Sequence, residues 1–221
     1  KTSVYGEEIK ALTFTITEGE LATGDTNTDL AVSLVKAEGI VVGNYAITGT
    51  STSANYNVTV LPGNYEITRR AITVKADNQT SVYGEALVED LTFTITEGEL
   101  AQGDTNESLA VSLVKAEGIV VGNYAITGTS TSANYDVTVE AGNYEITRRA
   151  ITVKADDKTS IYGNELEALT FTITEGELAQ GDTNESLAVS LVKAEGIVVG
   201  NYAITGTSTS ENYDVTVEAG N

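Results

Sequence analysis

The amino-acid sequence predicts a mainly β fold, made of three tandem small β-domains arranged as an elongated rod. First, a short motif returns at offsets of 78 and 79 residues, as Val4-Tyr5-Gly6, Val82-Tyr83-Gly84 and Ile161-Tyr162-Gly163. Second, short segments alternate apolar and polar residues, which is the period of a strand with one buried face. Third, glycine, asparagine and aspartate separate these segments, as turns require.

The repeats are nearly identical. Leu91–Asn143 and Leu169–Asn221 differ at one of 53 aligned positions, and Leu12–Asn64 differs from Leu91–Asn143 at six. A period of about 79 residues is longer than that of solenoid repeats and suits a small domain with its own core. We therefore expect three domains, at residues 1–70, 71–149 and 150–221.

Five segments of the middle repeat are expected to be strands. Leu91–Thr96 alternates most cleanly, with Leu91, Phe93 and Ile95 on the inner face. The others combine β-branched residues or tyrosine with flanking turn residues; they are Ala71–Lys75, Tyr124–Thr127, Tyr135–Val139 and Tyr144–Thr147. Gly128–Ser132 is expected to be a polar loop.

The segment Asn106–Gly118 fits two structures. It has the cap, early acid and terminal glycine of a helix. It also places Leu109, Val111 and Leu113 on one face of a strand. We favour the strand, because the alternation is clean and the neighbouring segments are β.

The unit 71–149 is the only complete repeat. Repeat one is expected to lack its first strand, and repeat three its last. We expect such incomplete sheets to expose edges through which molecules associate end to end. Between repeats, Tyr65–Ala76 and Tyr144–Ala155 run from a closing strand to an opening strand with only two arginines between them. Such short connections indicate a restrained joint with the adjacent repeat.

Composition excludes several functions. The chain has 12 Lys and Arg against 32 Asp and Glu, a formal net charge of −20, so binding to nucleic acid or to an anionic membrane is not expected. No apolar stretch approaches the ~20 residues of a membrane span. Cysteine and histidine are absent, which excludes disulfides and Cys/His zinc sites.

The remaining chemistry rests on carboxylates. Glu97, Glu99, Asp104 and Glu107 lie in turns, but an acid–base pair would need one of them buried. We therefore expect no catalytic residues and no enzyme. Calcium is a weak alternative, since it prefers carboxylate and carbonyl oxygens. Its candidate ligands are Asp104, Asn106, Glu107, Asp156 and Asp157, although no EF-hand loop occurs. No cofactor is otherwise expected.

Two further features have alternative interpretations. Lys115 and Lys75 lie in predicted strands, where an isopeptide bond to Asn123 or Asn134 is a minor alternative to a solvated lysine. The 11 tyrosines would suit a carbohydrate platform. Because many of them open a strand after asparagine, we favour packed rings with hydrogen-bonded hydroxyls.

Taken in order, the motifs resemble the MBG domain of YGX type. The resemblance rests on Ala71–Asp77 before Val82-Tyr83-Gly84, on Gly103-Asp104-Thr105, on Gly122–Thr127 and on Asn143–Thr147, and it covers all three repeats. It implies tandem arrays in large bacterial surface and adhesin-like proteins. It also implies a mainly β domain, β-grasp-like or, as an alternative, an immunoglobulin-like sandwich, and it supplies no catalytic residues.

These features favour an extracellular stalk on a bacterial cell surface. Three beads of about 30 Å would span roughly 90 Å, and their like charges would repel one another at low salt. We expect this stalk or spacer to project the distal binding domain of an adhesin. The alternative is a repeated adhesive module that binds a host glycan or protein, such as mucin.

Overall fold

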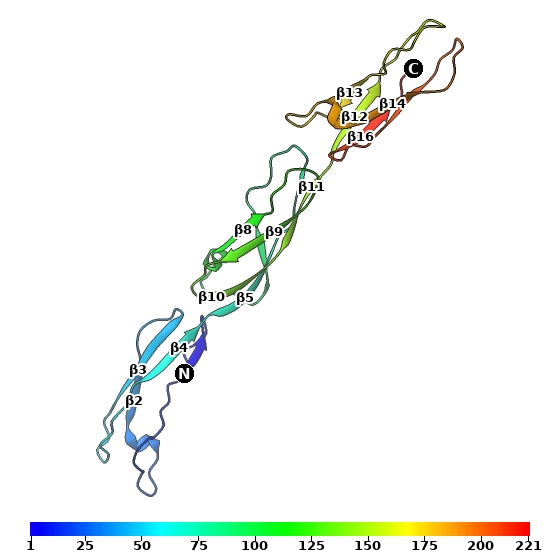
Figure 1. Ribbon diagram of the computed structural model, residues 1–221. Helices are drawn as coiled ribbons and strands as arrows, with labels where there is room; N and C mark the ends of the chain where they lie inside the picture. Colours follow the sequence, from blue (N-terminus) through cyan, green and yellow to red (C-terminus); the bar gives the residue numbers. More distant parts are fainter. The chain divides into compact units, whose positions relative to one another are not determined.

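The computed structural model describes all 221 residues and is mainly β, with three short 3-10 helices and no α-helix (Figure 1). Its strands and its three repeated units confirm the predicted mainly β fold of three tandem units, whereas the β-grasp-like or immunoglobulin-like type and the rod arrangement stay predictions. Repeat one contains β1 (Thr2–Val4), β2 (Val32–Lys36), β3 (Gly43–Ser51) and β4 (Gly63–Thr68). The middle repeat contains β5 (Arg70–Ala76), β6 (Gln79–Val82), β7 (Phe93–Glu97), β8 (Val111–Lys115), β9 (Gly122–Ser130), β10 (Tyr135–Glu140) and β11 (Gly142–Thr147). Repeat three contains β12 (Arg149–Ala155), β13 (Phe171–Glu175), β14 (Val189–Lys193), β15 (Ile204–Ser208) and β16 (Tyr213–Glu218).

The chain divides into two compact units, and the division falls inside the middle repeat. The first unit comprises Lys1–Lys75, Thr94–Ser112 and Gly128–Glu140. The second comprises Ala76–Phe93, Leu113–Thr127 and Ala141–Asn221. Each junction between two repeats therefore lies within a single unit.

The middle repeat shows the strand pairing of a full unit. One sheet has the order β10-β5-β7, and the other has the order β6-β11-β9-β8. The opening strand β5 is central in the first sheet and pairs in parallel with β10, from Arg70 opposite Tyr135 to Lys75 opposite Glu140. The closing strand β11 is central in the second, parallel to β6 and antiparallel to β9.

Repeat one forms only one of these two sheets, with the order β1-β4-β3-β2. Residues 14–18 and 56–61, which align with β7 and β10, are not strands. Both have lost the same partner, because no strand equivalent to β5 lies between them. A strand needs a ladder on at least one side, so the loss of one central strand removes two neighbours.

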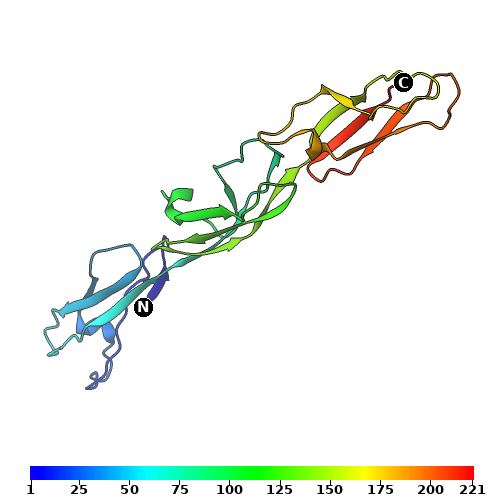
Figure 2. The ribbon, with the colours of Figure 1, turned by 45° about the horizontal axis from the view of Figure 1, so that its top comes forward.

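Repeat three has the opposite defect. Its first sheet is complete, with β12 between β13 and β16, as Figure 2 shows. Its second sheet keeps only β14 and β15. Residues 158–160 and 200–203, which align with β6 and the start of β9, are not strands. A single bridge between Ile204 and Gly220 marks the place where β11 begins in the middle repeat.

The segment at Asn106–Gly118 combines both structures considered from the sequence. Asn106–Leu109 forms a 3-10 helix, and the strand begins only at Val111. The prediction of a strand through Leu109 is therefore wrong, although Leu109 is buried. The Thr105 and Ser108 side chains form a capping box, which stabilises the turn. Gly128–Ser130, expected in a loop, instead extends β9.

The alternating pattern does place apolar side chains inward. In repeat three, Ile151 and Val153 of β12 are buried with Leu187 and Tyr213. In the second sheet of the middle repeat, Ile126, Tyr144 and Ile146 form a separate buried cluster. In β7, Phe93 and Ile95 are half-buried while Thr94 and Thr96 are exposed. The cores are thus small, which is typical of domains of this size.

Ala110 offers a test of the turn that precedes each β8-type strand. It has left-handed dihedral angles, φ 45° and ψ 44°, which favour glycine. We expect Ala110→Gly to raise the free energy of unfolding by about 1 kcal/mol, measured by urea denaturation. The matched control is Ala125→Gly, at an exposed position of β9. This substitution should lower the free energy of unfolding by roughly 0.5–1 kcal/mol. An equal loss of the free energy of unfolding in both variants would contradict the left-handed conformation of Ala110.

Candidate functional site: the joints between repeats

The most elaborate polar constellation lies where one repeat meets the next. The closing strand β4 ends at Thr68 and the opening strand β5 begins at Arg70, so one residue separates them. The second junction has the same spacing, with Arg148 between β11 and β12. Because the backbone runs from one repeat's sheet straight into the next, the flanking side chains are brought together at each junction.

At the first joint, the Tyr-Gly motif of repeat one packs against the middle repeat. The rings of Tyr5 and Tyr135 meet edge to face, with centroids 5.5 Å apart and planes at 81°. Beside them Gly6 approaches Ala101 so closely that a Cβ on Gly6 would lie 2.4 Å from the Ala101 Cβ. Gly6 also has a φ of +79°, so both its backbone and its surroundings require glycine.

Tyr135 is the centre of the polar network at this joint. Its ring is buried, its hydroxyl donates to Asp104 Oδ2 at 2.6 Å, and it accepts from the Ala101 amide at 2.8 Å. Burial, and then the hydrogen bond to Asp104, raises the pKa of Tyr135 to about 12. The pKa of Tyr5 is also raised, first by burial and then by the same Asp104 carboxylate. The joint therefore holds both tyrosines in the neutral form.

The two arginines at the junction bind main-chain carbonyl groups. Arg70 Nε donates to the Tyr5 carbonyl at 2.9 Å, while the Arg70 amide donates to the Asn134 carbonyl at 3.0 Å. Arg69 Nε donates to the Ala133 carbonyl at 3.2 Å. The Asn134 side chain in turn accepts from the Val42 amide of repeat one. These bonds tie the strand ends of both repeats to the junction.

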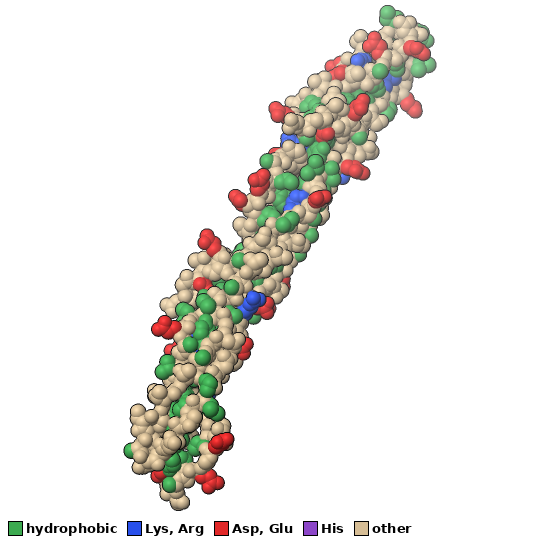
Figure 3. Space-filling view, turned by 60° about the vertical axis from the view of Figure 1, so that its left-hand side comes forward, with side chains coloured by type: hydrophobic (Ala, Val, Ile, Leu, Met, Phe, Trp, Pro, Cys, Tyr) green, Lys and Arg blue, Asp and Glu red, His purple; other side chains and the backbone are tan.

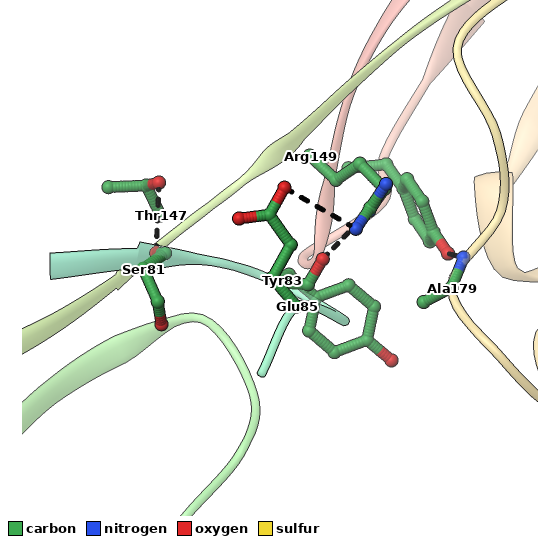
Figure 4. Close-up of polar contacts among 7 residues, drawn as sticks. Ser81, Tyr83, Glu85, Thr147, Arg149 and Ala179 are labelled. Carbon is green, nitrogen blue, oxygen red and sulfur yellow. Dashed lines mark hydrogen bonds and ion pairs between the residues drawn. The ribbon is translucent and has the colours of Figure 1, made fainter. Parts of the chain in front are cut away.

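The second joint repeats the first almost contact for contact. Tyr83 and Tyr213 lie 5.5 Å apart at 83°, and a Cβ on Gly84 would lie 2.3 Å from the Ala179 Cβ. Arg149 Nε donates to the Tyr83 carbonyl at 2.8 Å, and Arg149 also lies 3.9 Å from the Glu85 carboxylate (Figure 4). The hydroxyl of Tyr213, whose pKa is raised to about 12 by burial and by Asp182, accepts from the Ala179 amide.

Tyr83 belongs to the packing of two repeats at once. It contacts the buried cluster that contains Tyr144 and Ile146, at the end of the middle repeat. It also contacts the cluster of Ile151, Val153 and Tyr213 in repeat three. A shared core side chain couples the two clusters, since neither can move away without exposing its ring.

The two chain ends show each half of a joint without its partner. In repeat three, Tyr162 is 70% exposed, and a Cβ on Gly163 would meet no atom within 4 Å. In repeat one, Tyr56 already donates to Asp25 Oδ2 and accepts from the Ala22 amide, as Tyr135 and Tyr213 do elsewhere. The acceptor half thus forms its hydrogen bonds without a docked Tyr-Gly motif.

The calcium candidates are dispersed among other contacts. Asp104 accepts from Tyr135 in the joint, and Asn106 and Glu107 lie in the 3-10 helix. Asp156 accepts from the hydroxyls of Thr170 and Thr172, which lower its pKa, and Asp157 accepts from the Asn221 amide. No group of three or more acidic side chains is arranged to hold a metal ion. Calcium binding stays a prediction from the sequence.

The lysine considered for an isopeptide bond makes other contacts. Lys115 Nζ donates to the carbonyls of Ala116 and Gly118, at 2.8 and 2.7 Å. It also lies 4.3 Å from the centre of the Tyr124 ring, a cation–π geometry that recurs at Lys36 and Lys193. The Asn123 side chain accepts from Asn143. These contacts give the lysine a packing role at the base of a hairpin.

The fold and the joints define a class of protein: a mainly β tandem repeat in which a Tyr-Gly motif of one unit fits a preformed face of the next. The family model for the MBG domain (YGX type) matches residues 1–66, 72–147 and 151–221. The chain therefore belongs to the MBG domain (YGX type) family, as its resemblance suggested. No curated protein matches it. The structure contains no helix with the length and hydrophobicity of a membrane span.

The joint predicts different effects for one substitution at two equivalent positions. Gly84→Ala adds a methyl group where Ala179 leaves no room, and it also strains a φ of +77°. Gly163→Ala adds similar strain, at φ +88°, in open space. We expect Gly163→Ala to lower the free energy of unfolding by roughly 1–2 kcal/mol and Gly84→Ala to lower it by about 1–3 kcal/mol more. Denaturant unfolding of both variants tests this, and equal losses would show that the close approach is unimportant.

Alkaline pH is expected to weaken the joints. An unfolded tyrosine has its pKa near 10.0, whereas that of Tyr135 and Tyr213 is about 12 in the folded chain. Their contribution to stability is fully present below pH 10 and is lost as the pH rises from ~10 to ~12. Melting temperatures measured across this range should fall less steeply for the variant Tyr135→Phe/Tyr213→Phe than for the wild type. Parallel profiles would argue against the raised pKa values.

Proposed function

We propose that this chain is a structural stalk or spacer region of a bacterial cell-surface adhesin, located outside the cell, and that it is not an enzyme. MBG repeats are consistent with the repeat region of surface proteins. The observation that carries the proposal is the recurrence of one joint at both junctions, with tyrosine rings 5.5 Å apart each time. A contact that every unit can make with the next restrains each junction, which is what a spacer needs.

The surface chemistry supports the same role. The net charge is −20, and on the face shown in Figure 3 acidic side chains are scattered rather than gathered at one place. A dispersed negative charge favours solubility and weakens unspecific association. The carboxylates considered from the sequence as an acid–base pair include Asp104, which is bound to Tyr135. A distal binding domain would then supply the ligand specificity.

A second function has one observation in its favour. Each repeat exposes apolar residues after a Glu-Gly turn, and the exposed fractions are 75% at Ile40 and 72% at Ile119. The same tip in repeat three contains Ile197, Val198 and Val199. Repeated apolar tips suit an adhesive module that contacts a host glycan or protein, such as mucin. Under this alternative, binding would grow with repeat number through multivalency.

Small-angle scattering tests the spacer proposal. A single compact domain of 221 residues would have a radius of gyration of roughly 17 Å, whereas restrained joints should hold three beads over roughly 90 Å. We expect the measured radius of gyration to exceed that of the single compact domain. For Gly84→Ala we expect a shorter and broader distribution of interatomic distances. A compact profile would contradict the spacer. Saturable binding to mucin or a glycan array, lost on replacing Ile119 and Val120 by serine, would instead favour the adhesive module.

A further inference from the structure

The middle repeat contains two parallel ladders that share one register. In the first ladder, residues 70–75 of β5 pair with residues 135–140 of β10. In the second ladder, residues 79–82 of β6 pair with residues 144–147 of β11. Partner residues are 65 positions apart in both ladders. Two long segments of the chain are therefore joined to each other twice without a shift of register.

The chain is nearly continuous from one ladder to the next. Only Asp77 and Asn78 separate β5 from β6, and only Ala141 separates β10 from β11. Arg70 begins β5 after the junction with repeat one, and Thr147 ends β11 before the junction with repeat three. Tension along the chain therefore enters the repeat on the segment that contains β5 and β6. It leaves on the segment that contains β10 and β11, and the two ladders connect these segments directly.

The parallel pairing decides how the hydrogen bonds of a ladder are loaded. Tension pulls β5 toward its first residue and β10 toward its last, and in a parallel pair these two residues lie at opposite ends of the ladder. The strands are therefore pulled along each other, and the hydrogen bonds between them share the load. The same holds for β6 and β11. A load that entered both strands at the same end would instead open the ladder one pair at a time.

Further hydrogen bonds hold the loaded path at both of its ends. The Arg70 amide, where tension enters, donates to the Asn134 carbonyl at 3.0 Å. At the other end, in the second ladder, the Thr147 hydroxyl donates to the Ser81 carbonyl at 3.2 Å (Figure 4). The residues at which tension enters and leaves are thus both bonded to the partner segment.

Repeat three has the same arrangement after its junction. Its first strand β12 pairs in parallel with β16, from Arg149 opposite Tyr213 to Lys154 opposite Glu218. The Arg149 amide donates to the Asn212 carbonyl at 3.1 Å, as the equivalent amide does in the middle repeat. The strand that follows a junction therefore has a long parallel partner in both repeats.

We propose that these parallel ladders form a mechanical clamp, through which a repeat carries tension along the chain while its sheets stay folded. This function rests on the spacer role proposed above, since a stalk is under tension when its distal domain is bound. The resistance of such a clamp depends on direction. It is high when the two strands are pulled along each other and low when they are peeled apart from one end.

Two attachment geometries on the full chain test the clamp. The sequence contains no cysteine, so introduced cysteines give defined points for optical tweezers. The variant Ala71→Cys/Glu140→Cys loads the first ladder along its strands, whereas Ala71→Cys/Ala133→Cys loads both strands at their first residues. All three side chains are exposed. Under the same constant force, the first variant should stay folded at least ~10-fold longer than the second, because several hydrogen bonds must break together.

The controls separate direction of load from stability. Both variants should unfold in urea as the wild type does, since only exposed side chains change. The equivalent pairs in repeat three, Ala150→Cys with Glu218→Cys or with Glu211→Cys, repeat the comparison on β12 and β16. Equal lifetimes in the two geometries would overturn the clamp, even if scattering shows an extended chain. A compact scattering profile would contradict the spacer and leave a difference between the two lifetimes intact.

Discussion

The closing strand of one repeat continues into the opening strand of the next with a single arginine between them, and the rest of the structure depends on this continuity. Because the opening strand is central in its own sheet, the preceding repeat is anchored to the middle of a ladder and not to an edge. The arginines fix the strand ends by binding carbonyl groups on both sides. The Tyr-Gly loop is then held against the neighbouring repeat, where its ring can be buried.

Repeats one and three show how much each central strand supports. Without an equivalent of β5, repeat one loses both flanking strands, although the residues of those strands are present and nearly unchanged in sequence. Without an equivalent of β11, repeat three loses its counterpart of β6 and the first half of its counterpart of β9. Strand formation in these small sheets is therefore decided by the partner more than by intrinsic preference, as expected for β structure.

The sequence allowed most strands of the middle repeat to be predicted, because alternation directly reports which face is buried, but it missed β6. The short connections indicated a restrained joint, but the sequence did not reveal the contacts that form it, since alternation does not say which residue a buried ring will meet. Tyr5 and Tyr135 are 130 positions apart, and nothing local links them. A signal was present, because Tyr-Gly is found in all three repeats while the four-residue segment after it varies. Asp104 was interpreted as a calcium candidate for the same reason: its partner Tyr135 is distant in sequence.

The 3-10 helices also could not be predicted from the periodicity of apolar residues. A four-residue turn is too short to establish a helical repeat, and the following Ala110 adopts a left-handed conformation that alanine rarely signals. The adjacent strand was found correctly from Val111 onward. Short elements held by caps are therefore the part of this fold that sequence reasoning recovers least well.

The two faces of a joint are not alike: one presents Tyr-Gly and the other presents alanine, aspartate and a second tyrosine. Such a contact is heterologous and has a direction, so it cannot be satisfied by turning one partner around. Each repeat carries one face of each kind, and inserting or deleting a whole repeat leaves every remaining joint chemically unchanged. Because the joint has a direction, the number of repeats can change during evolution without any change to the remaining joints.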